Sequence, residues 1–510
     1  MGRVVVALIA SLWIIPISLF VNRIVPEPYM DEIFHIPQAQ QYCKGNFKSW
    51  DPMITTPPGL YCLSLVHIAS LFPGMSYAKS VTSFFELCSA AVLRSINGVL
   101  AVICSLFIYE ILMQLKPALS KRKAVFQAVV LSLYPLHWFF TFLYYTDVAS
   151  VTIVLAMYLA CLRQHFQLSA LLGALAILIR QTNVVWMVLV ASTGILKCIT
   201  PSNCKESAQS DDQDGSPSKY NALHEKESVP MGSNLRKRKS GTSLTAPGRY
   251  MSERIASPNS ASGFFDEVQV ILERLWLLKW EILVSFTPFL VVLLAFIAFV
   301  LWNGSIVLGA KEAHVVSRHF AQIMYFGLIS SLAMAPLTFS FSQFSLLYRS
   351  LRMNKLSSFF QILSGLTVGF ISVHFFSIEH PYLVADNRHY TFYIWRRVIK
   401  YNWFIKYLLI PLYVYSWLSI FNILGRVEKK IWTMIFFVAC AATLIPAPLI
   451  EFRYYTIPFY FLILHSRIDD TKSWALMGLM YVAVNIFTMV MFLFYPFHWN
   501  HEPGVQRFIW

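Results

Sequence analysis

The chain is a series of long apolar runs separated by short polar segments, a pattern typical of a protein that crosses a membrane many times. A helix needs about 20 apolar residues to cross the hydrocarbon core, and shorter runs suffice only where the helix is buried or irregular. By this criterion the sequence predicts an all-α polytopic membrane protein with about 13 transmembrane helices. Their approximate bounds are 3–21, 88–114, 124–140, 148–162, 167–179, 183–197, 280–301, 321–341, 357–377, 403–424, 430–447, 454–466 and 473–495.

The charges of the short connecting loops predict how the spans are oriented. Short loops rich in Lys and Arg stay on the cytosolic side of a membrane. If the N-terminus is cytosolic, every even-numbered loop is cytosolic, and each short one is basic. These loops carry Lys116 to Lys123, Arg163, Arg349 to Lys355, Arg426 to Lys430, and Arg467 to Lys472. The odd-numbered loops and the C-terminus are then expected on the luminal side, although several of those loops are also basic.

One polar segment divides the chain. Residues 199 to about 262 are rich in Ser, Pro, Asn and charge, and ten Lys/Arg balance ten Asp/Glu between 198 and 275. Such a segment cannot bury enough apolar surface to fold. We therefore expect a disordered cytosolic loop over 199–275. It separates an N-terminal membrane half (1–198, with a first luminal loop at 22–87) from a C-terminal membrane half (276–510).

Composition excludes several classes of protein. Only 13% of the residues are charged and 57% are hydrophobic, whereas a soluble domain carries about 25% charged residues. The formal net charge of +15 lies in the membrane part. Nucleic-acid binding would need a basic patch on a soluble domain, and no such patch is visible. The excess of basic residues instead indicates signals that orient the spans, or contacts with lipid head groups or anionic substrates.

The eight cysteines show neither CxxC nor Cys/His spacing, which argues against a zinc site. Cys43 and Cys62 share the first luminal loop, where an oxidising compartment would allow them to pair. Two free thiols are the alternative.

The first luminal loop holds the most informative polar residues. Asp31 and Glu32 follow the first span closely, and His35 comes one helical turn after Asp31. The simplest interpretation is a helix N-cap followed by a solvated loop. The functional interpretation is a general base at the membrane surface, because a carboxylate can accept the proton of a sugar hydroxyl.

Two later luminal loops carry further candidates. Asp386, Arg388 and His389 follow a span, and an arginine suits a phosphate because its planar, permanently charged group forks onto phosphate oxygens. Glu451 and Arg453 come after another span. The alternative for both loops is that their charged side chains simply pair with each other. Weaker candidates at the same membrane side are Arg94, Asp147 and Arg180.

Three of these segments together resemble a known family. They are residues 28–40 (PYMDEIFHIPQAQ), 380–395 (HPYLVADNRHYTFYIW) and 449–458 (LIEFRYYTIP). A Pro-Pro turn at 57–58 leads into a short apolar helix that is predicted to lie on the membrane. The segments are similar to those of the dolichyl-phosphate-glucose-dependent α-1,2-glucosyltransferases, which are membrane glycosyltransferases of the GT-C superfamily. The resemblance covers the whole chain except the polar loop.

The resemblance implies a GT-C fold with luminal interfacial helices and a place in the endoplasmic reticulum membrane. The implied reaction moves glucose from dolichyl-phosphate-glucose to the terminal glucose of Glc2Man9GlcNAc2-PP-dolichol. That step completes the lipid-linked oligosaccharide used for protein N-glycosylation. The donor linkage in the family is β and the new bond is α, so the transfer inverts the anomeric centre in a single displacement.

The resemblance and the residue chemistry together imply specific roles. Asp31 is the expected base, and Glu32 is the alternative base or an acceptor ligand. The expected ligands of the donor phosphate are Arg388 and His389, with Arg453 second. Further substrate-binding candidates are His35, Asp386, Glu451, Arg180 and Arg94.

No cofactor is expected. A divalent metal could be held by the neighbouring carboxylates, but a lipid-phosphate donor with arginine contacts does not require one. Two other classes of function remain open from sequence: a polytopic transporter or flippase, and a non-catalytic membrane subunit that regulates a channel or complex.

Overall fold

The computed structural model describes residues 1–71, 87–200, 263–468, 470–500 and 504–510, and these residues form helices and connecting loops without a β-strand. All thirteen apolar runs fall on helices, as predicted. Among the described residues, six helical segments are long and apolar enough to cross a membrane. They are α1 (Gly2–Ile24), α5 (Ala90–Leu115), α12 (Lys279–Asn303), α16 (Lys355–Phe375), the stretch Ile405–Leu424 and α23 (Thr471–Phe494). The protein is therefore an all-α polytopic membrane protein, and the number of about 13 transmembrane helices stays a prediction.

Several predicted spans are interrupted by proline. The run at 124–140 divides into α6 (Lys121–Ser132) and α7 (Pro135–Phe140), with Pro135 at the start of the second helix. The other interrupted runs give α13 (Ala321–Ala333) with α14 (Ala335–Thr338), and α19 (Ile405–Leu408) with α20 (Ile410–Leu424). Proline lacks a backbone donor, so it starts a helix more readily than it continues one.

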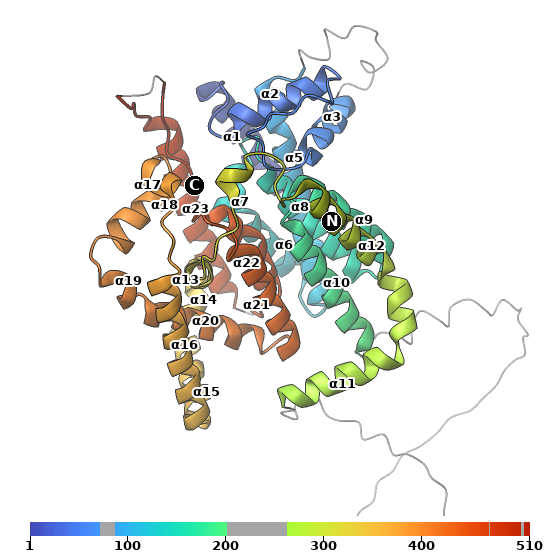
Figure 1. Ribbon diagram of the computed structural model, residues 1–510, viewed down its shortest axis with the longest axis vertical. Helices are drawn as coiled ribbons and strands as arrows, with labels where there is room; N and C mark the ends of the chain where they lie inside the picture. Colours follow the sequence, from blue (N-terminus) through green and yellow to red (C-terminus); the bar gives the residue numbers. More distant parts are fainter. Residues whose placement is uncertain (72–86, 201–262, 469, 501–503) are drawn as a thin grey trace, which may run out of the picture.

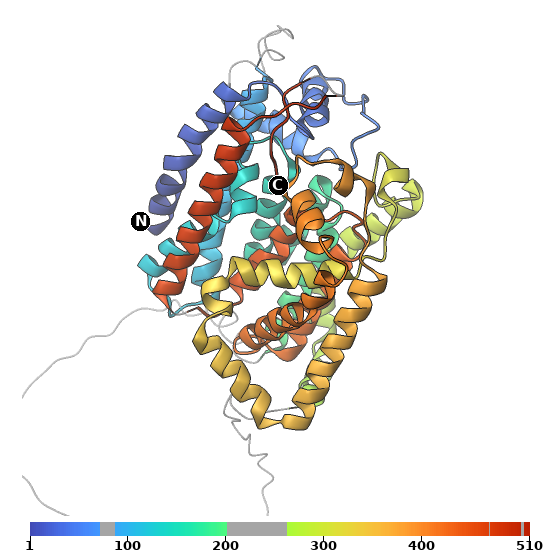
Figure 2. The ribbon, with the colours of Figure 1, turned by 90° about the vertical axis from the view of Figure 1, so that its left-hand side faces the viewer.

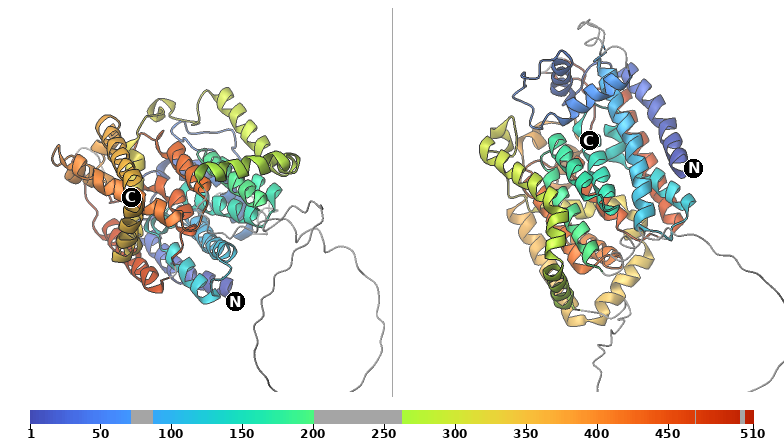
Figure 3. Two further views of the ribbon diagram at one scale, coloured as in Figure 1. Left: turned by 90° about the horizontal axis from the view of Figure 1, so that it is seen from below. Right: turned by 90° about the vertical axis from the view of Figure 1, so that its right-hand side faces the viewer.

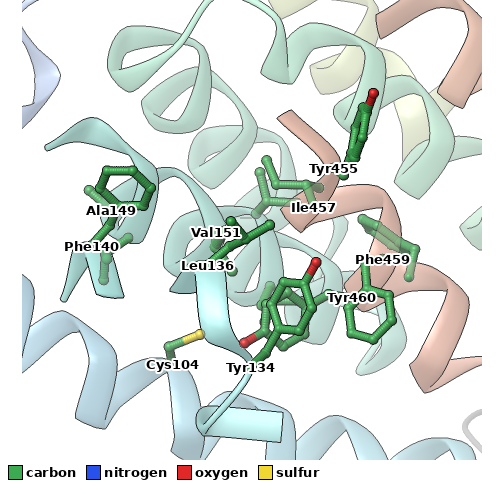
Figure 4. Close-up of a cluster of buried hydrophobic side chains, with 14 of the residues drawn as sticks. Cys104, Tyr134, Leu136, Phe140, Ala149, Val151, Tyr455, Ile457, Phe459 and Tyr460 are labelled. Atoms are coloured by element: carbon green, nitrogen blue, oxygen red, sulfur yellow. The ribbon is translucent and has the colours of Figure 1, made fainter. Parts of the chain in front are cut away.

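The centre of the molecule is made by two helices that are buried on every side. All residues of α8 (Thr146–Leu162) and α22 (Thr456–Leu464) are buried. Tyr134 stacks on Phe459 with 4.3 Å between ring centroids, and Tyr460 packs beside them (Figure 4). Because α22 belongs to the C-terminal half and packs on α5 and α8, this aromatic core joins the two halves.

The remaining helices surround this core. In the N-terminal half, α9 (Phe166–Ile179) and α10 (Asn183–Ile199) pack on α8. Helix α12, which belongs to the C-terminal half, covers their outer side (Figure 3). In the C-terminal half, α13, α16 and α20 pack together with α21 (Lys430–Leu444). The C-terminal ends of α1 and α23 lie side by side (Figure 2), and the ring centroids of Phe20 and Phe494 are 5.9 Å apart there.

Short helices gather at the two ends of the bundle. Helices α2 (Glu32–Cys43) and α3 (Gly59–Leu71) lie at the upper end, and α17 (Pro381–Ala385) and α18 (Tyr390–Ile394) lie on the same half of the molecule (Figure 1). Helices α11 (Phe264–Leu277) and α15 (Phe341–Met353) lie at the opposite end (Figure 1). The first two family-like segments, 28–40 and 380–395, therefore lie away from the end that carries α11 and α15.

The cysteine pairing considered from sequence is wrong. Cys43 bonds to Cys88, and Cys62 is free and exposed on α3. Cys43 ends α2 and Cys88 directly precedes α5, which brings their Cα atoms within 6.6 Å of each other. This spacing lies in the range that a disulfide can bridge.

The predicted disordered loop extends too far at its C-terminal end. Residues 264–277 form helix α11, whereas 201–262 lie outside the described residues. Glu267 accepts hydrogen bonds from the backbone N–H groups of Lys430 and Ile431, both at 3.3 Å. Arg274 donates to the carbonyl of Ile199 at 3.1 Å. Helix α11 thus supplies hydrogen-bond partners for backbone groups at the start of α21 and the end of α10. The polar sequence did not reveal this tertiary role.

Replacing residues 205–260 with a short Gly/Ser linker is expected to leave activity and thermal stability close to those of the unaltered protein. The segment is polar and nearly neutral, and the length of a surface connection has little effect on stability. Extending the replacement through α11 removes both capping contacts, each worth about 1 kcal/mol, and should lower the melting temperature. The two deletions are compared by thermal unfolding in detergent. Equal melting temperatures would contradict the role of α11.

Candidate active site

The side chain of Asp31 is partly exposed at the beginning of α2. Its carboxylate accepts a hydrogen bond from Nη1 of Arg453 at 2.8 Å, and 40% of the side chain is accessible. Its backbone N–H donates to the hydroxyl of Tyr145 at 3.2 Å. The preceding residue, Met30, has φ of +55°, an uncommon conformation for a residue with a side chain. Arg453 therefore holds the Asp31 carboxylate and Tyr145 holds its backbone, while part of the side chain stays accessible.

The neighbouring carboxylate is enclosed. Glu32 is completely buried, and Arg94 donates to its two oxygens at 2.8 and 2.6 Å. The backbone N–H groups of Tyr29 and Tyr144 also donate to it, at 3.1 and 2.6 Å. A carboxylate with four donors and no exposed surface has no room for an acceptor hydroxyl. Glu32 joins the first loop to α5 and to the turn before α8.

Arg94 is enclosed in the same way. Its remaining N–H groups donate to the side chain of Asn22 at 3.1 Å and to the carbonyls of Val25 and Glu27 at 2.6 and 3.0 Å. Arg94 is 2% exposed. It was expected among the substrate-binding residues, but the structure places it inside the protein, where it binds the end of α1 and the first loop.

A cluster of charged side chains surrounds Asp31. Arg453 also pairs with Glu451, and its Nη1 lies 4.0 Å from Asp147. Arg180 donates to both oxygens of Asp147 at 2.9 and 3.4 Å. Asp147, a weak candidate from sequence, therefore bridges two arginines from different elements. It begins α8, Arg180 lies in the turn between α9 and α10, and Arg453 lies just before α22.

His35 lies on the same side of α2 as Asp31. Its Nδ1 is 2.6 Å from the hydroxyl of Tyr61 on α3, so α2 and α3 are joined at this point. Burial lowers the pKa of the His35 imidazole more than the nearby Asp31 charge raises it. His35 is accordingly neutral at neutral pH.

The electrostatics keep Asp31 ionised. Burial by itself would raise the pKa of this carboxyl, but the charge and the hydrogen bond of Arg453 lower it by more. The net pKa lies below the ordinary value for aspartate, so Asp31 is a carboxylate at neutral pH. This is the protonation state that a general base needs.

A cavity of about 170 Å³ lies beside this cluster. It is lined by residues from all three segments that carried the family resemblance. The lining consists of Met30 from the first, of Tyr382, Leu383, Asp386, His389 and Thr391 from the second, and of Leu449, Ile450 and Glu451 from the third. Mostly apolar walls with a few polar groups are typical of a small-molecule site.

Arg388 lies behind the cavity wall. Its Nε and Nη2 donate to the two oxygens of Asp386 at 2.8 and 2.7 Å, and its Nη1 donates to Gln506 at 3.0 Å. The guanidinium also stacks over Trp499 at 4.6 Å. Burial raises the pKa of the Asp386 carboxyl, but the hydrogen bonds and charge of Arg388 together with the nearby His389 lower it by more, so Asp386 is ionised.

The segment 495–510 was not anticipated as part of the site. Gln506 meets Arg388, and the carbonyl of Trp510 accepts a hydrogen bond from His389 Nδ1 at 2.9 Å. No sequence motif marked this segment, because its contacts are to residues more than a hundred positions away in the chain.

The carboxylates of the cavity are already paired. Asp386 binds Arg388, and Glu451 binds Arg453. Within the described residues no group of three His, Cys, Asp or Glu side chains has the arrangement of a metal site. Metal independence nevertheless stays a prediction.

Comparisons with known proteins place this geometry in context. The family model described as the DIE2/ALG10 family matches residues 25–464. A protein of Arabidopsis thaliana is 55% identical over the full length of both chains. Relatives from mouse and human are 32% and 31% identical, over 96% of this chain and 94% of theirs. All three carry the name Dol-P-Glc:Glc(2)Man(9)GlcNAc(2)-PP-Dol alpha-1,2-glucosyltransferase. No solved structure matches the chain significantly.

Proposed function

The chain belongs to the DIE2/ALG10 family, and from this we propose that it is a dolichyl-phosphate-glucose-dependent α-1,2-glucosyltransferase. Its donor is Dol-P-Glc and its acceptor is Glc2Man9GlcNAc2-PP-Dol, the substrates in the names of its relatives. It adds the last glucose of the lipid-linked oligosaccharide. Both substrates are membrane lipids, which agrees with the many apolar helices of the protein.

One observation carries the assignment of the site. Three segments that are separate in the chain, the first more than 300 residues before the other two, line a single cavity, and Met30 in its wall directly precedes Asp31. Glu32 is enclosed by Arg94, whereas the Asp31 side chain is 40% accessible. This difference in accessibility favours Asp31 as the base and makes Glu32 a residue that positions the first loop.

Transfer then proceeds in one displacement. The Asp31 carboxylate accepts the proton of the acceptor's 2-hydroxyl while that oxygen bonds to the anomeric carbon of the donor glucose. The bond between the anomeric carbon and the phosphate oxygen breaks, and its electron pair leaves with dolichyl phosphate. The β linkage of the donor becomes an α-1,2 linkage, as an inverting reaction requires. Arg453 keeps Asp31 ionised and fixes its orientation.

Positive groups near the cavity receive the leaving phosphate. His389 lines the cavity, so it is placed for direct contact. Arg388 stabilises the same wall through Asp386 and contributes its charge from behind. Arg453 is the second candidate for the phosphate, and Arg180 adds charge through the same cluster. Cations at this place offset the negative charge that grows on the phosphate.

The other candidate residues take supporting roles. Asp386 and Glu451 line the cavity and offer oxygens to sugar hydroxyls. His35 lies beside Asp31 and joins α2 to α3 through Tyr61. Arg94 is assigned a positioning role because it is buried against Glu32. No cofactor or metal is needed for this scheme, since arginines serve the phosphate.

The site is proposed to face the lumen of the endoplasmic reticulum. The disulfide between Cys43 and Cys88 joins the end of α2, the helix that begins next to Asp31, to the residues before α5, and disulfides persist in oxidising compartments. The basic loops at the other end agree with a cytosolic side. The N-terminus is accordingly cytosolic, and the C-terminal segment lies with the site on the luminal side.

The direct test uses the purified protein in lipid nanodiscs with synthetic Dol-P-Glc and a diglucosylated lipid-linked acceptor. The expected product is the acceptor plus one hexose, released again by an α-1,2-specific glucosidase. A folded protein that does not transfer glucose between these two substrates would overturn the proposal. It would favour a transporter or a non-catalytic subunit.

Arg388→Ala is expected to weaken donor binding by about 10–150-fold, because it removes a positive charge behind the cavity wall and the charged hydrogen bonds that hold Asp386 in that wall. Arg388→Lys should retain part of the affinity, because lysine keeps the charge but lacks the planar fork. Donor titrations measure both variants, with Arg397→Ala as the control because Arg397 is exposed outside the cavity. Unchanged affinity in Arg388→Ala would transfer the phosphate role to Arg453.

A further inference from the structure

The segment Gly504–Trp510 runs along the loop that carries Arg388 and His389. The backbone N–H of Ile509 donates to the carbonyl of Arg388 at 2.9 Å, and the N–H of Tyr390 donates to the carbonyl of Ile509 at 3.2 Å. Ile509 is 1% exposed. Two backbone hydrogen bonds around a buried side chain fix the path of the loop on both sides of His389.

The same segment determines which nitrogen of His389 is free. The carbonyl of Trp510 can only accept a hydrogen bond, so His389 Nδ1 carries the proton in their 2.9 Å contact. In the neutral ring Nε2 is then the unprotonated nitrogen, and in the protonated ring Nε2–H is the one donor left for a phosphate oxygen. It lies 3.8 Å from the carboxylate of Asp386, which lines the cavity. The Trp510 carbonyl therefore sets both the tautomer and the orientation of a residue in the cavity wall.

The segment also contacts the loop that bears Asp31. The hydroxyl of Tyr29 accepts a hydrogen bond from the backbone N–H of Arg507 and donates one to its carbonyl, both at 2.7 Å. Tyr29 is 8% exposed, and its own N–H donates to Glu32. The next residue, Met30, lines the cavity. One short segment thus binds two walls of the same cavity.

We propose that residues 504–510 are a positioning strap that sets the loop 386–390 against the loop carrying Asp31. The strap touches no reacting atom in this scheme. It holds His389, the proposed ligand of the donor phosphate, and the backbone of Arg388 at a fixed place relative to the proposed base. The proposal rests on the proposed function for the roles of His389 and Asp31, while the contacts of the strap do not depend on it.

Two variants test the strap in the full-length protein in nanodiscs. Tyr29→Phe removes both hydrogen bonds to Arg507, and Gln506→Ala removes the side-chain contact to Arg388. Each is expected to raise the KM for Dol-P-Glc about tenfold, which is the usual effect of losing one or two hydrogen bonds. The kcat should stay within about twofold of that of the unaltered protein. The control is Tyr495→Phe, because the Tyr495 side chain is 58% exposed and its hydroxyl has no hydrogen bond to the described residues.

A second measurement separates positioning from stability. Hydrogen exchange of the peptide containing Arg388–Tyr390 should become faster in both variants and stay unchanged in the control, because the Tyr390 amide is released. A purely structural role would instead lower kcat through an inactive fraction and leave the donor KM unchanged. That result, or unaltered exchange at 388–390, overturns the strap. If the unaltered protein transfers no glucose, the proposed function fails, and the exchange data still decide whether the strap holds the loop.

Discussion

Asp31→Asn is expected to lower kcat by about 10²–10⁴-fold, the usual contribution of a general base. Asparagine keeps the shape of the side chain and a hydrogen-bonding oxygen for Arg453, but it cannot accept the hydroxyl proton. Donor affinity should change little, because His389, the proposed phosphate ligand, lies elsewhere in the cavity wall. The measurement is glucose transfer by the purified protein under saturating donor, with donor binding measured separately.

Glu32→Gln is the matched comparison. It lies at the next position, but its carboxylate is buried against Arg94. Losing that charge should reduce the amount of folded protein, whereas turnover per folded molecule stays close to that of the unaltered enzyme. The reverse ranking would assign the base to Glu32. Full activity in both variants would show that neither carboxylate of this loop is the catalytic base.

The pH dependence follows from the Asp31–Arg453 pair. Because Arg453 lowers the pKa of Asp31 below the ordinary aspartate value, the base remains ionised as the pH falls from 7 to about 5. Rate loss from protonation of this group should appear only at still lower pH. A fall in kcat/KM centred near neutral pH would therefore point to another group.

Arg94→Leu is expected to destabilise the protein by about 3–5 kcal/mol, the cost of breaking a buried ion pair by removing one partner. The substitution leaves Glu32 as a buried carboxylate without its main counterion, and it removes donors to Val25 and Glu27. Thermal unfolding in detergent and the yield of folded protein measure the effect.

Two further variants make this result specific to the buried pair. Replacing Glu32 and Arg94 together with leucine should recover part of the lost stability, because two apolar side chains leave no charge unpaired. Arg3→Gln, which alters an exposed pair with Glu110, should not change the melting temperature measurably. A melting temperature of Arg94→Leu equal to that of Arg3→Gln would contradict the structural role of Arg94.

Much of the architecture was predictable because it depends on local pattern. Apolar runs of sufficient length form membrane helices regardless of their partners, and all thirteen predicted runs fall on helices. The breaks at Pro135 and Pro336 were missed because hydropathy does not register a missing backbone donor. Helix α11 was missed because its stability comes from contacts with α10 and α21 rather than from its own composition.

The sequence by itself determined that this protein is built from many membrane helices, and it singled out three polar segments as candidates for its chemistry. Only the tertiary structure decided where each polar side chain lies and which groups it contacts. Asp31 and Glu32 are neighbours of the same charge, yet successive positions on a helix point about 100° apart, so one faces the open cluster and the other faces Arg94. The Cys43–Cys88 bond and the contact of Arg388 with Gln506 join positions distant in the chain. Such pairs depend on how helices pack around the core of α8 and α22, and no local pattern of residues encodes that distance.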